Sequence, residues 1–208
     1  MKKIIILPII FLSCLFSSAQ NHIKFNGATF GQPLNTFIVG FLKGTYGRPP
    51  EQSMEKITYG RDYNPDLYNL HLGTINLNAR EWQCNIHSSR KSNIVFQTIS
   101  VRHSDDMQND LMYLVKTLED KYGGHKEASK EELGKIYYKY YYFEDYREML
   151  ALTYYIKNTS GNTIGEVRVS CAPNSNDGKS GYIELNYTDY AALKIAQSEY
   201  NSIMNDAL

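Results

Sequence analysis

Residues 150–187, with the sequence LALTYYIKNTSGNTIGEVRVSCAPNSNDGKSGYIELNY, decide the fold of this chain. Three runs of alternating, strand-forming residues occupy 150–157, 163–172 and 182–187, and turns rich in Asn, Ser and Gly separate them. No segment between the runs has a helical pattern, although parallel strands need a long crossover that is usually a helix. The stretch therefore predicts an antiparallel meander.

Short strand-like runs also occur at 74–78, 81–87 and 93–102, and the last two are expected to form a hairpin. A further strand is expected at 135–143. Because the strands follow one another through polar turns, the pattern favours an α+β fold with antiparallel sheet over a doubly wound parallel sheet.

Three helices are expected around these strands. The first covers 33–46, the second follows Ser104 or Asp105 as its N-cap, and the third follows Thr188 or Asp189. Their apolar stripes are Leu34, Phe37, Ile38, Phe41, Leu42 and Tyr46, then Met107, Leu111, Leu114, Val115, Leu118 and Tyr122, and finally Leu193, Ala196, Tyr200 and Ile203.

The first two helices end alike. Leu42-x-x-x-Tyr46-Gly47 matches Leu118-x-x-x-Tyr122-Gly123, and each motif precedes a run of strands. This weak repeat suggests a tandem of two helix-plus-meander units, with halves at 20–103 and 104–208. The alternative is chance, because many helices end in an aromatic residue followed by glycine.

Residues 1–19 have the pattern of a secretory signal peptide: two lysines, an apolar run, and small residues before a cut at Gln20. A membrane span is the main alternative, but the run is shorter than the about 20 residues that a span needs. A lipid anchor at Cys14 is a second alternative, and the residues around Cys14 match a lipobox poorly. We therefore expect a single exported domain, 20–208, that is periplasmic or extracellular and has no transmembrane span.

The composition excludes several classes of protein. The 208 residues contain 22 basic and 22 acidic side chains, and removal of residues 1–19 leaves 20 basic and 22 acidic ones. This balance argues against a nucleic-acid binder. With 42% apolar and 13% aromatic residues, the chain is not expected to be disordered.

No pattern indicates a catalytic or metal site, and no cofactor is expected. Cys84 and His87 are separated by an odd number of positions on a strand, which directs their side chains to opposite faces. The segment His103-Ser104-Asp105-Asp106 contains the residue types of a hydrolase triad, but helix capping explains its serine and aspartates.

Cys84 and Cys171 are the two cysteines beyond the signal, and strand alternation directs both inward. In an oxidising compartment such a pair can form a disulfide. The alternative is two separate buried thiols, which behave as small apolar side chains.

Tyrosines are concentrated on the expected strands, and alternation directs one set of them outward. This set is Tyr137, Tyr141, Tyr155 and Tyr182, edged by Lys139 and Lys157. Such a face suits a protein, peptide or glycan partner, because tyrosine combines a large rigid ring with a hydrogen-bonding tip. The alternative is that these rings only stabilise the sheet or lie beneath a helix.

Short motifs extend over most of the chain after the signal: Ile23-Lys24-Phe25-Asn26-Gly27, Leu34-Asn35-Thr36-Phe37 and Ile183-Glu184-Leu185-Asn186-Tyr187-Thr188-Asp189. With these motifs the chain resembles small secreted proteins of unknown function from Gram-negative bacteria. The resemblance implies an α+β fold and export, and it implies no activity. The expected tandem also resembles the architecture of secreted β-lactamase inhibitory proteins, an analogy of fold alone.

We therefore expect an exported, non-enzymatic binding or protein-interaction domain. The alternative is a hydrolase acting on envelope or glycan material, which requires a cleft that gathers histidines or carboxyl groups with shifted pKa values.

Overall fold

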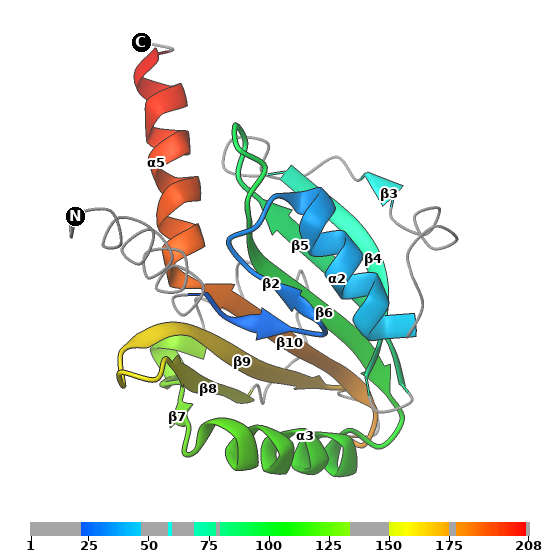
Figure 1. Ribbon diagram of the computed structural model, residues 1–208. Coiled ribbons are helices and arrows are strands. Elements are labelled where there is room, and N and C mark those ends of the chain that lie inside the picture. Colours follow the sequence, from blue (N-terminus) through cyan, green and yellow to red (C-terminus); the bar gives the residue numbers. More distant parts are fainter. Residues whose placement is uncertain are drawn as a thin grey trace, which may run out of the picture.

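The structure, a computed structural model, describes residues 22–46, 58–59, 69–77, 80–133, 150–174 and 178–206. An antiparallel sheet with the strand order β3-β4-β5-β6-β10-β9-β8-β7 forms its centre (Figure 1). Its strands are β3 Thr58–Tyr59, β4 Asn69–Leu77, β5 Arg80–Ser88, β6 Val95–Ser104, β7 Lys126–Glu127, β8 Leu150–Lys157, β9 Thr163–Pro173 and β10 Gly181–Asp189. The helices are α2 Leu34–Tyr46, α3 Met107–Tyr122 and α5 Tyr190–Asp206, and a small hairpin consists of β1 Lys24–Phe25 and β2 Ala28–Thr29. The predicted α+β class with antiparallel sheet is confirmed.

The sheet consists of two similar parts. In the described residues, α2 is followed by the meander β4-β5-β6, and α3 is followed, after the short β7, by the meander β8-β9-β10. The two meanders meet at their last strands, where β6 and β10 pair from Ser104↔Gly181 to Gln97↔Thr188. This is the element order of the expected helix-plus-meander tandem, and the two halves share one continuous sheet.

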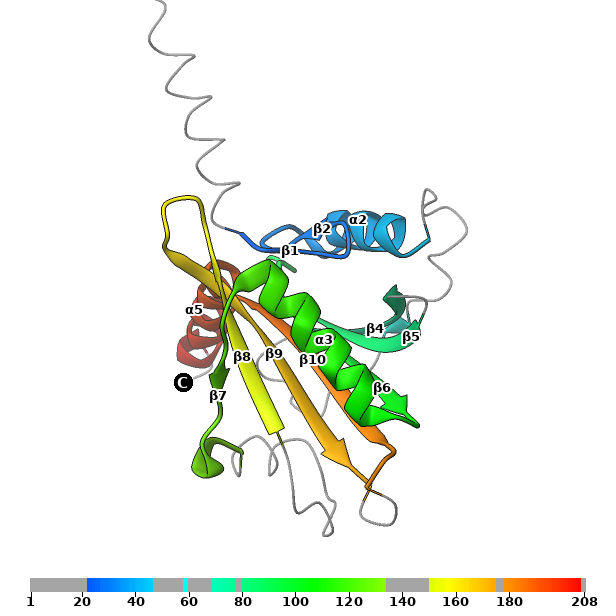
Figure 2. The ribbon, with the colours of Figure 1, turned by 90° about the horizontal axis from the view of Figure 1, so that it is seen from below.

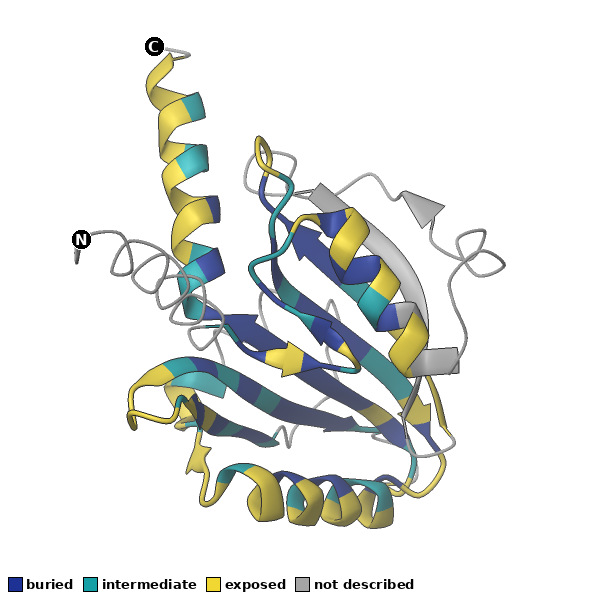
Figure 3. Cartoon of the chain, in the orientation of Figure 1, coloured by how far each residue is buried: buried dark blue, intermediate teal, exposed yellow. Residues whose placement is uncertain are grey.

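One face of the sheet carries the main core. Here α2, α3 and the β1-β2 hairpin lie against the sheet (Figure 2). Their buried side chains form one core with apolar side chains of β5, β6, β8, β9 and β10. The described residues of the apolar stripes predicted for α2 and α3 face the sheet. In α2, Leu34, Phe37, Ile38 and Phe41 are almost fully buried. Figure 3 shows the same division on α3, whose buried residues face the sheet and whose exposed residues face away from it. The side chains of Leu42 and Tyr46 lie outside the described residues.

The opposite face, which we call the far face, is polar and only partly covered by a described helix. The N-terminal half of α5 packs there through Ala192 and Ala196 against Phe96. A β-bulge permits this contact: His87 pairs with Gln97 and Ser88 with Val95, so Phe96 is the extra residue on β6. No helix of the described residues is long and apolar enough to cross a membrane.

The structure identifies the N-cap residues of α3 and α5. The expected N-cap of α3 is corrected, and for α5 one of the two candidates is selected. The N-cap of α3 is Asp106, which accepts a hydrogen bond from Asn109 N, so neither Ser104 nor Asp105 is the cap. For α5 the cap is Asp189, one of the two candidates, whose carboxylate accepts from Ala192 N at 2.8 Å. Helix starts differ from sequence predictions by a residue or two because several neighbouring polar residues can supply a capping oxygen.

The carboxylate of Asp189 also fixes the start of the described chain. It accepts a hydrogen bond from Ile23 N at 2.8 Å and pairs with His22 Nδ1 at 3.0 Å, and Asp189 itself is fully buried. The β1-β2 hairpin continues from this point, and the Phe25 ring stacks on Tyr187 of β10 with centroids 4.3 Å apart. The segment that begins at His22 is therefore part of the core.

The candidate disulfide between Cys84 and Cys171 is not formed, and the alternative of two separate buried thiols holds. Cys84 on β5 and Cys171 on β9 are both buried, as expected, but both are free thiols. Two strands, β6 and β10, lie between β5 and β9, which places the cysteines about 14 Å apart across the sheet at about 4.8 Å per strand. A disulfide needs Cα atoms within about 7 Å. Alternation indicated the correct face but not the number of intervening strands.

Candidate functional site

The far face brings polar side chains from six strands together. Strand register and alternation assign residues to it. The residues on this face include Gln83, Asn85 and His87 of β5; Gln97, Ile99, Val101 and His103 of β6; Tyr182, Glu184, Asn186 and Thr188 of β10; Glu166, Arg168, Ser170 and Ala172 of β9; Ala151, Thr153, Tyr155 and Lys157 of β8; and Lys126 of β7.

Three of the predicted binding residues lie on this far face. Tyr155 is 42% exposed, Tyr182 is 39% exposed, and Lys157 is exposed. Tyr155 pairs with Glu166 and Tyr182 with Ala172, positions about 20 Å apart along β9 at about 3.3 Å per residue. The structure therefore does not bring these two tyrosines together.

The other three predicted binding residues, Tyr137, Lys139 and Tyr141, lie outside the described residues, as does the strand expected at 135–143. Among the described residues, Tyr155 lines one cavity, and Tyr182 contacts His103, which lines another.

Tyr155 lines a cavity of about 330 Å³ at the β7 side of the far face, which we call the Tyr155 cavity. Thr153 lies at its centre, because Thr153 pairs with Lys126 of β7 on one side and with Arg168 of β9 on the other. Tyr155 and Glu166 form the next row along the same strands. A cavity of this size is at the lower end of the range of about 300–1,000 Å³ for small-molecule sites.

An ion pair at the outer rim of this cavity is fixed by a local motif. Ser129-x-x-Glu132 is a capping box: Ser129 N donates to Glu132 Oε2 at 2.8 Å, and Glu132 N donates to Ser129 Oγ at 3.2 Å. Glu132 Oε1 then accepts from Lys126 Nζ at 3.0 Å. The hydrogen bond from the Ser129 backbone and the contact with Lys126 lower the pKa of Glu132 to about 2, so this carboxylate is charged at neutral pH.

A second ion pair lies on the inner side of the cavity. Glu166 Oε1 accepts from Arg168 at 3.1 Å, and Glu166 Oε2 accepts from the Tyr190 hydroxyl at 2.7 Å. Both carboxylate oxygens are therefore occupied, and the guanidinium group of Arg168 keeps further N–H groups for a ligand. Tyr190 is the first residue of α5, so the helix on the far face also positions this side chain.

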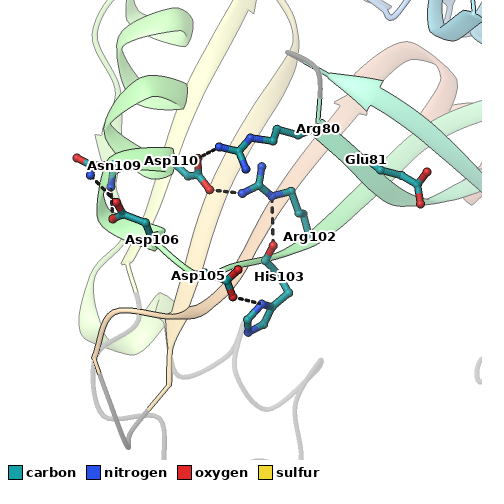
Figure 4. A pocket seen from close by; sticks show the side chains of 8 residues that line it. All are labelled: Arg80, Glu81, Arg102, His103, Asp105, Asp106, Asn109 and Asp110. Carbon is teal, nitrogen blue, oxygen red and sulfur yellow. Dashed lines mark hydrogen bonds and ion pairs between the residues drawn. The ribbon is translucent and has the colours of Figure 1, made fainter.

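The other cavity, of about 320 Å³, lies where β5 and β6 reach the start of α3 (Figure 4). Arg80 and Arg102 both reach the carboxylate of Asp110, and the Arg102 guanidinium lies 5.8 Å from the centre of the Trp82 ring. Ser104 Oγ donates to the same carboxylate. The contacts of Asp110 join β5, β6 and α3, and we interpret this cluster as structural.

His103 lines this second cavity and connects it with Tyr182. Its ring meets the Tyr182 ring edge to face, with centroids 5.2 Å apart, and its Nδ1 is 3.5 Å from the Asp105 carboxylate. Ser104 points to the opposite face of β6 and bonds to Asp110. The triad residue types at 103–106 are therefore not arranged as a triad.

On the far face, Glu184 is a carboxyl group whose pKa is raised from the usual 4.5 to near neutral pH. It is 6% exposed, and burial raises its pKa to about 7 against the opposing charge of Arg168. It pairs with Val101 and Ser170 across the strands and is not among the residues that line either cavity. Glu166, the acid on the neighbouring strand, is about 13 Å away along β9. Glycosidase carboxyl pairs are about 5–9.5 Å apart.

The histidines whose side chains the structure describes do not converge either. His87 is buried and bonds to Gln97, whereas His103 is at the other end of β6, about 20 Å away. His125 pairs with Glu119 of α3 at 3.1 Å, and the side chain of His71 lies outside the described residues. In the part of the chain that the structure describes, no group of three or more His, Cys, Asp or Glu residues could hold a metal ion.

Sequence reasoning missed Lys126, Glu132, Thr153, Glu166 and Arg168, which surround Tyr155. One signal was present: Ser129-x-x-Glu132 is a recognisable capping box that fixes the Glu132 carboxylate. The register of β7, β8 and β9 gathers the other side chains, and single-sequence patterns do not encode this register.

Comparisons with models of known protein families, with curated proteins and with solved structures found no match for this chain.

Proposed function

We propose that the chain is an exported, non-enzymatic binding domain that binds its ligand at the Tyr155 cavity. The observation that carries this proposal is a half-exposed tyrosine ring beside a cavity whose ion pairs are fixed by their own hydrogen bonds. Side chains that are held in place before binding lose little conformational entropy when a ligand arrives, which favours affinity. Export rests on the signal pattern of residues 1–19.

Two observations favour binding over hydrolysis at this place. The acids of the cavity, Glu132 and Glu166, are engaged by hydrogen bonds from Ser129, Lys126, Arg168 and Tyr190. A general acid near neutral pH needs a raised pKa, whereas the pKa of Glu132 is lowered. The carboxyl group with a raised pKa, Glu184, lies outside the cavity.

Arrays of glycans and peptides test this proposal directly. Residues 20–208 should give discrete hits, and Tyr155→Ala should remove them by deleting the exposed ring. Tyr113→Ala is the matched control, because Tyr113 is 58% exposed on α3, away from the far face. Bound probes should be recovered intact by mass spectrometry. No hits, hits that persist in Tyr155→Ala, or cleaved probes would contradict the proposal.

A further inference from the structure

We infer that the Tyr155 cavity binds a neutral saccharide, with one sugar ring packed against the Tyr155 side chain. This inference rests on the proposed binding function and adds the chemical class of the ligand.

The geometry of the cavity suits one sugar ring. Lys126 and Arg168 flank Thr153 from the two adjacent strands, so their backbones are about 10 Å apart. Tyr155 is the next residue after Thr153 on the same face of β8, it is 42% exposed, and its ring supplies an apolar surface. The C–H groups of a pyranose ring can pack on that surface while its hydroxyl groups reach the polar rim.

The charges favour a neutral ligand. Lys126 is paired with Glu132 at 3.0 Å and Arg168 with Glu166 at 3.1 Å, so the two cations of the cavity are balanced by two carboxylates. A phosphate or carboxylate group entering the cavity would approach both of these acids, and a cationic group would approach Lys126 and Arg168. Neither class is therefore favoured by the charges present.

The cavity offers both hydrogen-bond donors and hydrogen-bond acceptors, which are the two roles that a sugar hydroxyl needs in its partners. A sugar hydroxyl both donates and accepts, and the cavity offers N–H donors from Arg168 and Lys126, lone pairs on Glu132, and the two-way hydroxyl of Thr153. A peptide fits these groups less well than a sugar does. An extended peptide presents its backbone N–H and C=O groups in alternation along a line, whereas a sugar ring presents several hydroxyl groups close together.

Solution titration tests the inference with defined probes: maltotriose, cellotriose and triacetylchitotriose, compared with a capped tetraglycine and with inorganic phosphate. At least one trisaccharide should bind residues 20–208 with a Kd of about 1 mM, the order expected for one small sugar ring. Backbone NMR shifts should change at Lys126, Thr153 and Tyr155. Raising NaCl from about 50 to about 500 mM should change the Kd less than about twofold, because the ligand carries no charge.

The variants separate ring contact from loss of folding. Tyr155→Ala should weaken trisaccharide binding at least about tenfold, the factor that corresponds to loss of one good contact, whereas Tyr155→Phe and Tyr113→Ala should bind as the unchanged chain does. Circular dichroism confirms folding of each variant, and Thr153→Val, with nearly the same side-chain shape, gives a second test through loss of one hydroxyl.

The outcomes distinguish the two proposals. If tetraglycine or phosphate binds at Tyr155 and no trisaccharide does, the saccharide inference is overturned while a binding function at this cavity stands. If no probe binds, or if trisaccharides shift residues elsewhere and Tyr155→Ala binds normally, the inference is overturned, and the arrays alone then decide the proposed function.

Discussion

At the scale of single residues, Glu184 couples the stability of the fold to pH. Its pKa of about 7 lies above the usual 4.5 because burial disfavours the charged carboxylate. The folded chain therefore holds a proton between about pH 4.5 and 7 that the unfolded chain releases. The free energy of unfolding contributed by this group falls as pH rises through that window, and then stays constant above it.

Glu184→Gln should remove this dependence, because the amide has no charge to bury. The variant should match the unchanged chain near pH 4 and exceed it above pH 7, by up to about 3 kcal/mol at 1.36 kcal/mol per pKa unit. Urea unfolding from pH 4 to 8 measures the difference between the two curves. Equal slopes in both proteins would show that Glu184 titrates normally.

His22 also makes the stability of the fold depend on pH, so it must be the same in the two proteins that are compared. Its hydrogen bond to Asp189 raises its pKa above 6.5, so its stabilising contribution is complete below pH 6.5 and is lost as pH rises through the higher folded value. Both groups thus weaken the fold toward alkaline pH. Because His22 is present in both proteins, the difference between Glu184→Gln and the unchanged chain isolates Glu184.

Only part of the candidate site could be predicted from the residues themselves. Strand alternation placed Tyr155, Lys157 and Tyr182 on one face correctly, because the side-chain period of a strand is fixed. It could not show that Tyr155 and Tyr182 lie at opposite ends of that face, since their separation depends on the register with β9. The same alternation places Glu184 on this face, but its burial depends on tertiary contacts that alternation does not contain.

At the scale of elements, α2 and the β1-β2 hairpin approach each other closely through glycines. A methyl group added to Gly44 would overlap the carbonyl oxygen of Asn26, and one added to Gly40 would lie 2.8 Å from the carbonyl oxygen of Gly27. The apolar stripe of α2 was predictable from periodicity. This hairpin contact was not, because two-residue strands such as β1 and β2 have no periodicity to detect.

Gly44→Ala should therefore destabilise the fold, whereas a glycine-to-alanine substitution in a helix usually stabilises it. Alanine normally stabilises a helix interior by about 1 kcal/mol relative to glycine, whereas overpacking costs about 1–3 kcal/mol. Gly124→Ala is the control, since nothing lies within 4 Å of a methyl group there. Thermal unfolding should show a lower Tm for Gly44→Ala alone, and a raised Tm would mean that the hairpin does not contact α2.

At the scale of the whole molecule, several contacts join the two halves. The central β6–β10 pair belongs to both meanders, and the buried carboxylate of Asp189 holds Ile23 and the start of α5 together. The main core draws residues from both halves, including Ile86 and Val167, which are fully buried. The order of helices and strands was predictable from turn and capping signals, but the pairing of β6 with β10 was not, because it joins segments far apart in the sequence.

A shared sheet and core should make unfolding a single cooperative transition. The chain has one tryptophan, Trp82 of β5, which is buried and reports on the first half alone. Val167→Ala removes buried methyl groups from β9 in the second half and should cost roughly 2 kcal/mol. Its unfolding curve should shift by the same amount whether it is followed by Trp82 fluorescence or by circular dichroism, because unfolding of one half removes the partner strand and part of the core of the other. A Trp82 transition that stays at its original midpoint would instead mean that the two units unfold independently, despite the pairing of β6 with β10.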